Sequence, residues 1–127
     1  MVLECSLYRL ALVTGATSGI GKEVCKLFAG KGINLILTGR NEEELKLLKE
    51  SLSPLVSVQF ISADLSTAEG RRHIVQAIHE NCPDLVINNA GFGFIGEALT
   101  YQTNEQVEIL EVNGKAVLEL SLEAART

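Results

Sequence analysis

The sequence LVTGATSGIGKEV, residues 12–24, is the most informative stretch of this chain. An apolar run leads into a turn with glycines at positions 15, 19 and 21, and a helical pattern follows the turn. Three residues separate Gly15 from Gly19, where the common dinucleotide-binding fingerprint has one, so the loop is a variant of that pattern. Backbone N–H groups and the positive end of a helix dipole converge at such a turn. The stretch therefore predicts a strand, a phosphate-binding loop and a helix.

The small residues of this loop each have a physical task in that interpretation. Gly15 permits the tight turn, and Gly19 lets a pyrophosphate group approach the backbone closely. Gly21 lets the helix pack against the strand. Thr17 and Ser18 can add hydroxyl donors. These five residues are the first candidates for a nucleotide site.

Two other glycine patterns compete with this interpretation. A nucleoside-triphosphatase loop would need glycine where Ala16 stands and a magnesium-binding hydroxyl where Glu23 stands. The stretch GFGFIG, residues 91–96, matches the glycine fingerprint letter by letter, but polar residues separate it from the next helix start. No helix N-terminus points into it, so we predict a flexible loop that lines a ligand crevice at the end of a strand.

Composition excludes several classes of protein. The chain has 127 residues, 46% of them hydrophobic and 21% charged, which is typical of one globular domain. Its net charge of −5 leaves no basic stripe for nucleic acid or an anionic membrane, and no stretch has the apolar length of a membrane span. The N-terminal residues lack the cleavage site of a signal peptide. Cys5, Cys25 and Cys82 lack metal-site spacing, so we expect reduced thiols, no metal and a cytoplasmic location.

Apolar runs alternate with helical patterns along the whole chain. Four near-continuous apolar runs predict parallel strands that are covered on both faces: residues 9–14, 33–38, 56–62 and 84–89. Apolar residues at helical spacing fill two of the intervals: Ile20, Val24, Leu27 and Phe28 in the first, and Ile74, Val75 and Ile78 in the third. The pattern predicts an α/β fold of type (βα)4, a three-layer parallel sheet in a single domain over residues 1–127.

Helix starts and the last helix add detail to this fold. Asn41, Ser66 and Thr103 each stand three residues before Glu or Gln, the spacing of a capping box. From about Thr103 onward the chain carries two apolar stripes: Val107, Leu110, Gly114 and Val117, and Ile109, Val112, Ala116 and Leu120. Each apolar stripe needs a surface to pack against, so two stripes require two such surfaces. We expect one to cover the sheet and the other to meet a second subunit or further chain.

Four motifs in register resemble the short-chain dehydrogenase/reductase family. TGATSGIG at residues 14–21 is similar to that family's cofactor loop, and AD at residues 63–64 to its adenine-contacting position. NNAG at residues 88–91 resembles its fourth-strand signature, and VNGKAV at residues 112–117 its helix asparagine. The resemblance covers the chain from about Arg9. It implies the Rossmann-type strand order 3-2-1-4 and the N-terminal, cofactor-binding half of an oxidoreductase.

The resemblance also implies roles for individual residues. The cofactor-binding residues of the glycine loop would be Gly15, Thr17, Ser18, Gly19, Ile20 and Gly21. Asp64 would accept a hydrogen bond from the adenine amino group, with Leu65 near the ring, although the residues alone also allow Asp64 to cap the next helix. Asn88 would tie neighbouring strands together. Asn89, Ala90 and Gly91 would bind the cofactor, the last two by leaving room beside its ribose.

Asn113 is the candidate catalytic residue. An asparagine beside an apolar stripe is either a satisfied core amide or a site residue, because a buried unpaired amide costs about 1 to 3 kcal/mol. The resemblance implies that Asn113 helps to bind a water that feeds a proton relay. Both interpretations stay open on the sequence alone.

The end of the second strand predicts the cofactor. The dinucleotide fold places the group that reads the adenosine ribose about 20 residues beyond the glycine loop. Gly39 stands where NAD-using relatives carry a carboxylate, and Arg40 follows it. A guanidinium can pair with a 2′-phosphate, whereas a carboxylate would repel it. We therefore expect NADP rather than NAD, although Arg40 could also be a solvated charge.

Two functions of different kinds follow. The first is an NADP-dependent carbonyl reductase or alcohol dehydrogenase, acting on a small carbonyl or alcohol substrate; the second is a non-catalytic dinucleotide-binding module. The resemblance implies that the enzyme would need a catalytic tyrosine followed four residues later by lysine, and a binding module would not. Leu12 follows Tyr8 and Glu105 follows Tyr101 at this spacing, so we expect a chain truncated before its catalytic segment and inactive alone. The bare outer edge of the fourth strand and the spare helix stripe predict a homo-oligomer.

Overall fold

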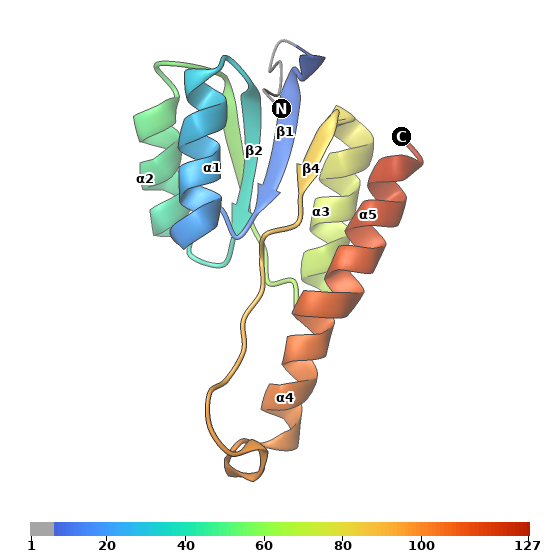
Figure 1. The fold of residues 1–127 in the computed structure, drawn as a ribbon. Helices are drawn as coiled ribbons and strands as arrows, with labels where there is room; N and C mark the ends of the chain where they lie inside the picture. The colour runs from blue at the N-terminus through green and yellow to red at the C-terminus, as the bar shows by residue number, and fades with distance from the viewer. Residues whose placement is uncertain (1–6) are drawn as a thin grey trace.

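The computed structural model describes residues 7–127, which form a parallel sheet between two layers of helices (Figure 1). The sheet has the order β3-β2-β1-β4. Its strands are β1 (Leu10–Thr14), β2 (Asn34–Gly39), β3 (Val58–Ser62) and β4 (Leu85–Ile87). The predicted fold class and strand order are therefore confirmed, although β4 is shorter than the apolar run suggested, because Asn88 and Asn89 leave the sheet.

The register brings the carboxyl ends of the strands to one edge. Thr14 of β1 pairs with Thr38 of β2, and Thr38 pairs with Ile61 of β3. On the other side of β1, Val13 pairs with Ile87 of β4. In an open α/β sheet, ligands bind at this edge.

Helices cover both faces of the sheet. The helices are α1 (Gly19–Gly30), α2 (Glu42–Leu52), α3 (Ala68–Asn81), α4 (Thr103–Leu110) and α5 (Val117–Ala125). α1 and α2 lie on one face, and α3 and α5 on the other (Figure 1). Each face has its own apolar core: Phe28 and Leu45 pack on the first, and Ile74 and Leu120 on the second. The alternating strand and helix patterns predicted these layers.

The buried face of α1 differs from the prediction. Phe28 is buried, but Ile20 is 75% exposed and Leu27 is 56% exposed. The face toward the sheet instead includes Gly21 and Cys25. Gly21 has no side chain and passes very close to the glycine loop, so the helix turns its small residues inward and leaves Ile20 in solvent.

Burial sets the state of one of the two described thiols. Cys25 and Cys82 are free thiols, the first buried and the second exposed, while Cys5 lies outside the described residues. Burial raises the pKa of the Cys25 thiol to about 12, which keeps it protonated and unreactive.

One of the three predicted helix caps is confirmed, and the other two are displaced by a residue. The Asn41 side chain accepts a hydrogen bond from the Glu44 N–H at 3.1 Å. The cap of α3 is Thr67, which accepts from the Gly70 N–H, because Ser66 is held in a turn by Asp64. α4 is preceded by Gln102, whose N–H donates to the Glu105 carboxylate at 2.8 Å.

The last helix is continuous and has three parts: α4, a π-helical segment and α5. Between α4 and α5 lies a π-helical segment, Glu111–Ala116, which the sequence pattern did not predict. Of the two predicted stripes, the one with Val112, Ala116 and Leu120 packs on the sheet. On the other stripe Val107 is 46% exposed and Leu110 is 70% exposed. α4 and the preceding loop extend beyond the carboxyl edge of the sheet (Figure 1).

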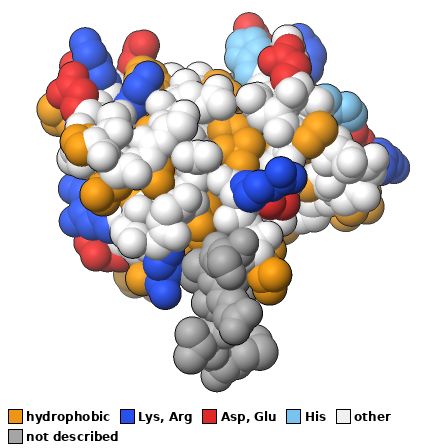
Figure 2. All heavy atoms as spheres, turned by 90° about the horizontal axis from the view of Figure 1, so that it is seen from above, with side chains coloured by type: hydrophobic (Ala, Val, Ile, Leu, Met, Phe, Trp, Pro, Cys, Tyr) orange, Lys and Arg blue, Asp and Glu red, His pale blue; other side chains and the backbone are white. Residues whose placement is uncertain are grey.

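Seen from the amino-terminal end of the sheet, charged side chains of both signs lie mainly around the rim of the molecule (Figure 2). Figure 2 views the molecule from that end, where acidic and basic side chains are interspersed among apolar ones. None of the described helices is both long and apolar enough to cross a membrane.

Candidate functional site

A cavity of about 300 Å³ lies at the carboxyl edge of the sheet. Its walls come from the loops after all four strands, with Val112 of the last helix closing one side. Eight of the predicted site residues line it: Gly15, Thr17, Ser18, Arg40, Asp64, Leu65, Ala90 and Gly91. Residues 75 positions apart in the sequence thus share one cavity, as the parallel topology requires.

The glycine loop is shaped by its backbone. Gly15 has a φ of +62° and Gly19 a φ of +27°, values that side chains disfavour. A Cβ on Gly21 would lie 2.1 Å from the Gly15 carbonyl oxygen, so only glycine fits there. The Ser18 hydroxyl donates to the same carbonyl at 3.2 Å. α1 begins at Gly19, directly after Ser18, which lines the cavity, so the amino-terminal end of the helix lies at the cavity edge.

Thr14 and Asn89 fasten the glycine loop to the end of β4. The Asn89 side-chain amide donates to the Gly15 carbonyl oxygen at 3.1 Å. The Thr14 hydroxyl accepts from the N–H groups of Asn89 and Ala90, at 3.0 and 2.9 Å. Asn89 thus supports the cavity from behind without lining it. The side chain of Asn88 donates instead to the Ser121 hydroxyl of α5, so Asn89 rather than Asn88 joins neighbouring strands.

The opposite wall carries the charged groups. Asp64 follows β3, and its carboxylate accepts from the hydroxyl and the N–H of Ser66 at 2.7 and 2.9 Å. Burial raises the pKa of the Asp64 carboxyl, but the two hydrogen bonds from Ser66 and the nearby Arg40 charge outweigh burial, so the pKa lies below the ordinary 3.8. Asp64 is therefore ionised at neutral pH and can accept further hydrogen bonds.

Asn113 holds the loop that follows β4. Its side-chain amide donates to the Phe92 carbonyl at 2.8 Å and accepts from the Phe92 N–H at 3.0 Å. Both halves of the amide are satisfied by backbone, and the residue is exposed rather than part of the core. It lies in the π-helical segment, a feature that is frequent at functional sites.

The GFGFIG stretch forms the predicted loop, and its aromatic residues pack together. Phe92 and Phe94 meet edge to face with ring centroids 5.9 Å apart, and Phe94 stacks on Tyr101 at 4.3 Å. The Tyr101 hydroxyl donates to the Ile95 carbonyl. Gly91 and Phe92 line the cavity, whereas the Ile95 side chain is 96% exposed.

The structure adds Thr38 to the site. Its side chain is 1% exposed and lines the cavity, and its hydroxyl has no hydrogen-bond partner among the described residues. This oxygen is itself buried, and a buried hydroxyl without a partner costs about 1 to 3 kcal/mol. The sequence signal for it was a threonine at the end of a buried strand, which alone is a common strand residue.

Several predicted site residues lie outside the cavity wall. Gly19, Gly21 and Asn89 shape or support the loop, and Ile20 faces solvent on α1. Within residues 7–127 no group of three or more His, Cys, Asp or Glu side chains could hold a metal ion.

Comparisons with known proteins agree with this geometry. A family model of short chain dehydrogenases matches residues 9–127. An uncharacterised oxidoreductase of Staphylococcus epidermidis is 30% identical over 112 residues, which are 87% of this chain and 48% of the relative. Dehydrogenase/reductase SDR family member 7B of Xenopus laevis is 34% identical over 113 residues, 82% of this chain and 35% of that protein.

Two solved structures are similar along nearly the whole chain. An alcohol dehydrogenase from Comamonas testosteroni that is specific for bulky-bulky ketones has a TM-score of 0.89 and 28% identity, over 93% of this chain and 49% of that one. A short-chain dehydrogenase from Sphingobium yanoikuyae, in complex with NADPH, has a TM-score of 0.89 and 27% identity, over 93% and 47%.

The sheet order and the glycine loop at its carboxyl edge define a Rossmann-type α/β domain. The chain belongs to the short-chain dehydrogenase family, a family of oxidoreductases. It spans about half of the length of the first of these relatives, 48%.

Proposed function

We propose that this chain is the cofactor-binding half of an NADP-dependent short-chain dehydrogenase/reductase that acts on a small carbonyl or alcohol substrate. The observation that carries the proposal is the cavity itself. One space collects the glycine loop, the Arg40 guanidinium and the Asp64 carboxylate, three groups that suit three different parts of a dinucleotide. The family membership supports the same assignment.

The residues of the cavity fit a dinucleotide chemically. The glycine loop and the start of α1 offer N–H groups to a pyrophosphate, with Thr17 and Ser18 as neighbouring hydroxyl donors. Asp64 would accept from the adenine amino group, and Leu65 would cover the ring.

Arg40 is the basis for NADP over NAD. It follows β2 and lines the cavity beside Gly39, which carries no carboxylate to accept from a ribose 2′-hydroxyl. A guanidinium pairs with a 2′-phosphate through parallel N–H donors. Glu44 also lines this side of the cavity, so Arg40 must offset its charge when a phosphate binds. The NADPH complex of the Sphingobium yanoikuyae relative supports the choice.

NADP supplies hydride transfer when it is bound. The residues of this chain bind and orient it, and Asn113 holds the Phe92 backbone on the side of the β4 loop. General acid catalysis by a tyrosine with a nearby lysine is worth about 10² to 10⁴ in rate. Neither described tyrosine has that lysine four residues on, so we expect the 127-residue chain to reduce no carbonyl compound by itself.

The charge at position 40 provides the test. In calorimetric titrations Arg40→Asp should weaken NADP binding at least about tenfold, because a carboxylate would repel the 2′-phosphate. NAD binding should be unchanged or improved. For the unmodified chain, NADP affinity should fall more steeply than NAD affinity as salt is added, since an exposed ionic contact is screened. An equal loss of both cofactors in the variant would rule out the assignment.

A non-catalytic dinucleotide-binding module is the second candidate. It is favoured by Tyr101, whose hydroxyl donates to a backbone carbonyl and whose ring is stacked on Phe94, an arrangement that leaves it in a structural role. Absorbance of NADPH at 340 nm, followed with a panel of ketones and aldehydes, distinguishes activity from binding alone. Steady oxidation by the purified chain, abolished by Gly19→Val, would contradict our expectation of an inactive chain.

A further inference from the structure

Arg71 is a buried cation outside the proposed cofactor contacts. It lies in the first turns of α3 and is 3% exposed. A charge taken out of water is costly unless it is paired and hydrogen-bonded, so the partners of this guanidinium are informative.

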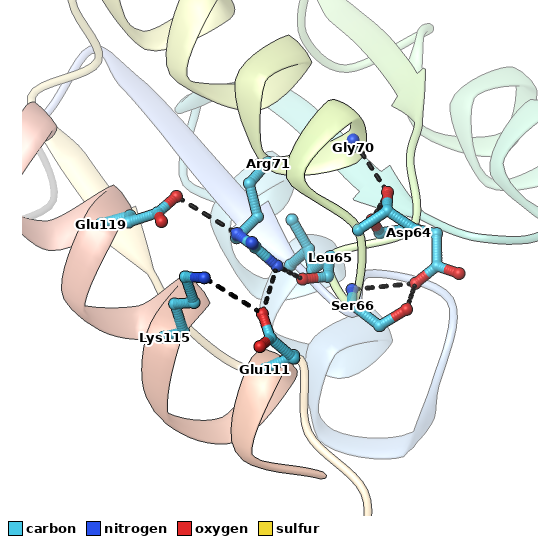
Figure 3. Close-up of polar contacts among 9 residues, drawn as sticks. Asp64, Leu65, Ser66, Gly70, Arg71, Glu111, Lys115 and Glu119 are labelled. Carbon is cyan, nitrogen blue, oxygen red and sulfur yellow. Dashed lines mark hydrogen bonds and ion pairs between the residues drawn. The ribbon is translucent and has the colours of Figure 1, made fainter. Parts of the chain in front are cut away.

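Three acceptors from two parts of the fold surround the guanidinium. Its Nη1 donates to the Leu65 carbonyl at 2.9 Å and lies 3.0 Å from the Glu111 carboxylate. Its Nε donates to the Glu119 carboxylate at 3.2 Å. Lys115 also reaches Glu111, at 3.6 Å. Figure 3 shows Arg71 pointing from α3 toward the last helix, with the Leu65 backbone beside it.

Each acceptor belongs to a structure that shapes the cavity. Leu65 lines the cavity next to Asp64. Glu111 begins the π-helical segment, and Glu119 lies two turns further along in α5. Asn113, within that segment, holds the backbone of Phe92 on the other side of the cavity. One side chain therefore joins the wall after β3 to the helix that fixes the wall after β4.

The packing of α3 makes this link short and rigid. A Cβ on Gly70 would lie 1.9 Å from the Asp64 carbonyl oxygen, so the first turn of α3 presses on the backbone just before Leu65. Arg71 follows immediately, and its planar fork reaches a carbonyl and two carboxylates at once. A lysine has a single charged nitrogen and cannot reproduce that geometry.

We propose that Arg71 is a positioning residue for nucleotide binding, which sets the distance between the two walls of the cavity by holding Leu65 to the helix that carries Asn113. This inference rests on the proposed function, because it assigns Arg71 to the same cavity. Arg71 does not line the cavity. It acts through the backbone of Leu65 and through the Asn113 contact with Phe92.

The same pair of helices offers a matched control. His79 of α3 and Glu123 of α5 form a contact at 2.7 Å, near the end of α3 that lies away from the cavity. Glu123→Gln weakens this contact and leaves the cavity untouched. Arg71→Met removes the charge and the fork and keeps an unbranched apolar side chain, and Arg71→Lys keeps the charge without the fork.

Binding of NADP and of 2′,5′-ADP to the folded chain tests the proposal, with folding checked by circular dichroism. Arg71→Met should weaken both ligands about tenfold, the effect of losing a well-placed contact, and Arg71→Lys by less. Glu123→Gln should bind as the original chain does. In ligand-free NMR spectra, the amide signals of Leu65 and Phe92 should both shift in Arg71→Met and stay in place in Glu123→Gln.

Each other outcome has a defined meaning. Original affinity in folded Arg71→Met, or an equal loss in Glu123→Gln, overturns the inference and leaves the proposed function intact. If Arg71→Met fails to fold, Glu111→Gln replaces it, and original affinity in that variant also overturns the inference. No binding by the unmodified chain overturns the proposed function first, and this inference with it.

Discussion

Two threonines side by side in the sheet have opposite hydrogen-bond environments. Thr14 and Thr38 are paired across β1 and β2, and each is 1% exposed. The Thr14 hydroxyl donates to the Ile87 carbonyl and accepts from two N–H groups at the end of β4. The Thr38 hydroxyl has no partner among the described residues and borders the cavity. The Thr14 hydroxyl therefore links β1 to the end of β4, whereas the Thr38 hydroxyl makes no hydrogen bond within the described part of the chain.

Valine at the two positions should therefore have opposite effects. Thr38→Val removes an unsatisfied buried hydroxyl, so the free energy of unfolding should stay equal or rise by up to about 1 kcal/mol. Thr14→Val should lower the free energy of unfolding by about 1 kcal/mol, because two part-buried N–H groups lose their acceptor. Urea unfolding measures both changes. A loss of stability in Thr38→Val as large as that in Thr14→Val would be inconsistent with this difference.

Residues whose role depends on local backbone geometry could be predicted, and residues whose role depends on distant partners could not. The conformation of Gly15 and the close packing of Gly21 agree with the sequence interpretation, because a turn between strand and helix requires them. Ile20 was expected on the buried face of α1, but its side chain is 75% exposed, since the rotation of α1 about its axis depends on packing. No sequence pattern pointed to a role for Arg71, because its partners are up to 48 residues away along the chain.

Strands β1 and β4 are joined at their amino ends by one carboxylate. Asp84 accepts from the Leu10 N–H at 2.9 Å and from the Arg9 N–H at 2.9 Å and 3.1 Å through its two oxygens. Burial raises the pKa of Asp84, but these backbone hydrogen bonds and the Arg9 charge outweigh it, so the pKa lies below the ordinary 3.8. The carboxylate form is the one that holds the strands.

This contact should make stability depend on pH in one direction. The folded-state pKa is lowered, so Asp84 stabilises the fold above about pH 4, its unfolded pKa, and the contribution is lost as pH falls through the folded pKa. Asp84→Asn should lower the free energy of unfolding by about 1 kcal/mol at pH 7. Chemical unfolding at a series of pH values should find this difference shrinking below pH 4. A difference that is constant with pH would contradict the role of the charge.

The elements themselves were predictable to different degrees. Apolar runs located all four strands, since parallel strands covered on both faces need continuous apolar residues. Two cap positions were displaced by one residue, because hydrogen bonds such as that from Ser66 to Asp64 compete with the expected capping box. The π-helical segment was not foreseen: Val112 and Ala116 keep ordinary helical spacing, and the wider turn is visible only in the backbone.

The molecule exposes an apolar surface along its last helix. Leu110 is 70% exposed, Leu118 60% and Leu122 47%, and the strand order leaves β4 at an edge of the sheet. Exposed apolar side chains on one helix and an unpaired strand edge are both surfaces that associate with other chains. A second copy of this chain would cover these three leucines by packing its own last helix against them.

Sedimentation velocity at increasing concentration checks this association. The chain should form dimers or larger species as concentration rises, and the double substitution Leu110→Gln and Leu118→Gln should shift the population toward monomer. The two leucines are exposed, so the variant should keep its free energy of unfolding within about 0.5 kcal/mol. A monomer at the highest attainable concentration would exclude the exposed leucines of the last helix as a homo-oligomer surface.

The account depends on a dinucleotide lying at the carboxyl edge of the sheet, and an NMR titration of the ¹⁵N-labelled chain with NADP examines that placement residue by residue. The amide signals that move should belong to the glycine loop, Arg40, Asp64, Leu65, Ala90 and Gly91. Signals from Asn34, Ser57 and Asp84, at the opposite end of the strands, should stay in place. Shifts confined to that opposite end, or no shifts at millimolar NADP, would contradict the account.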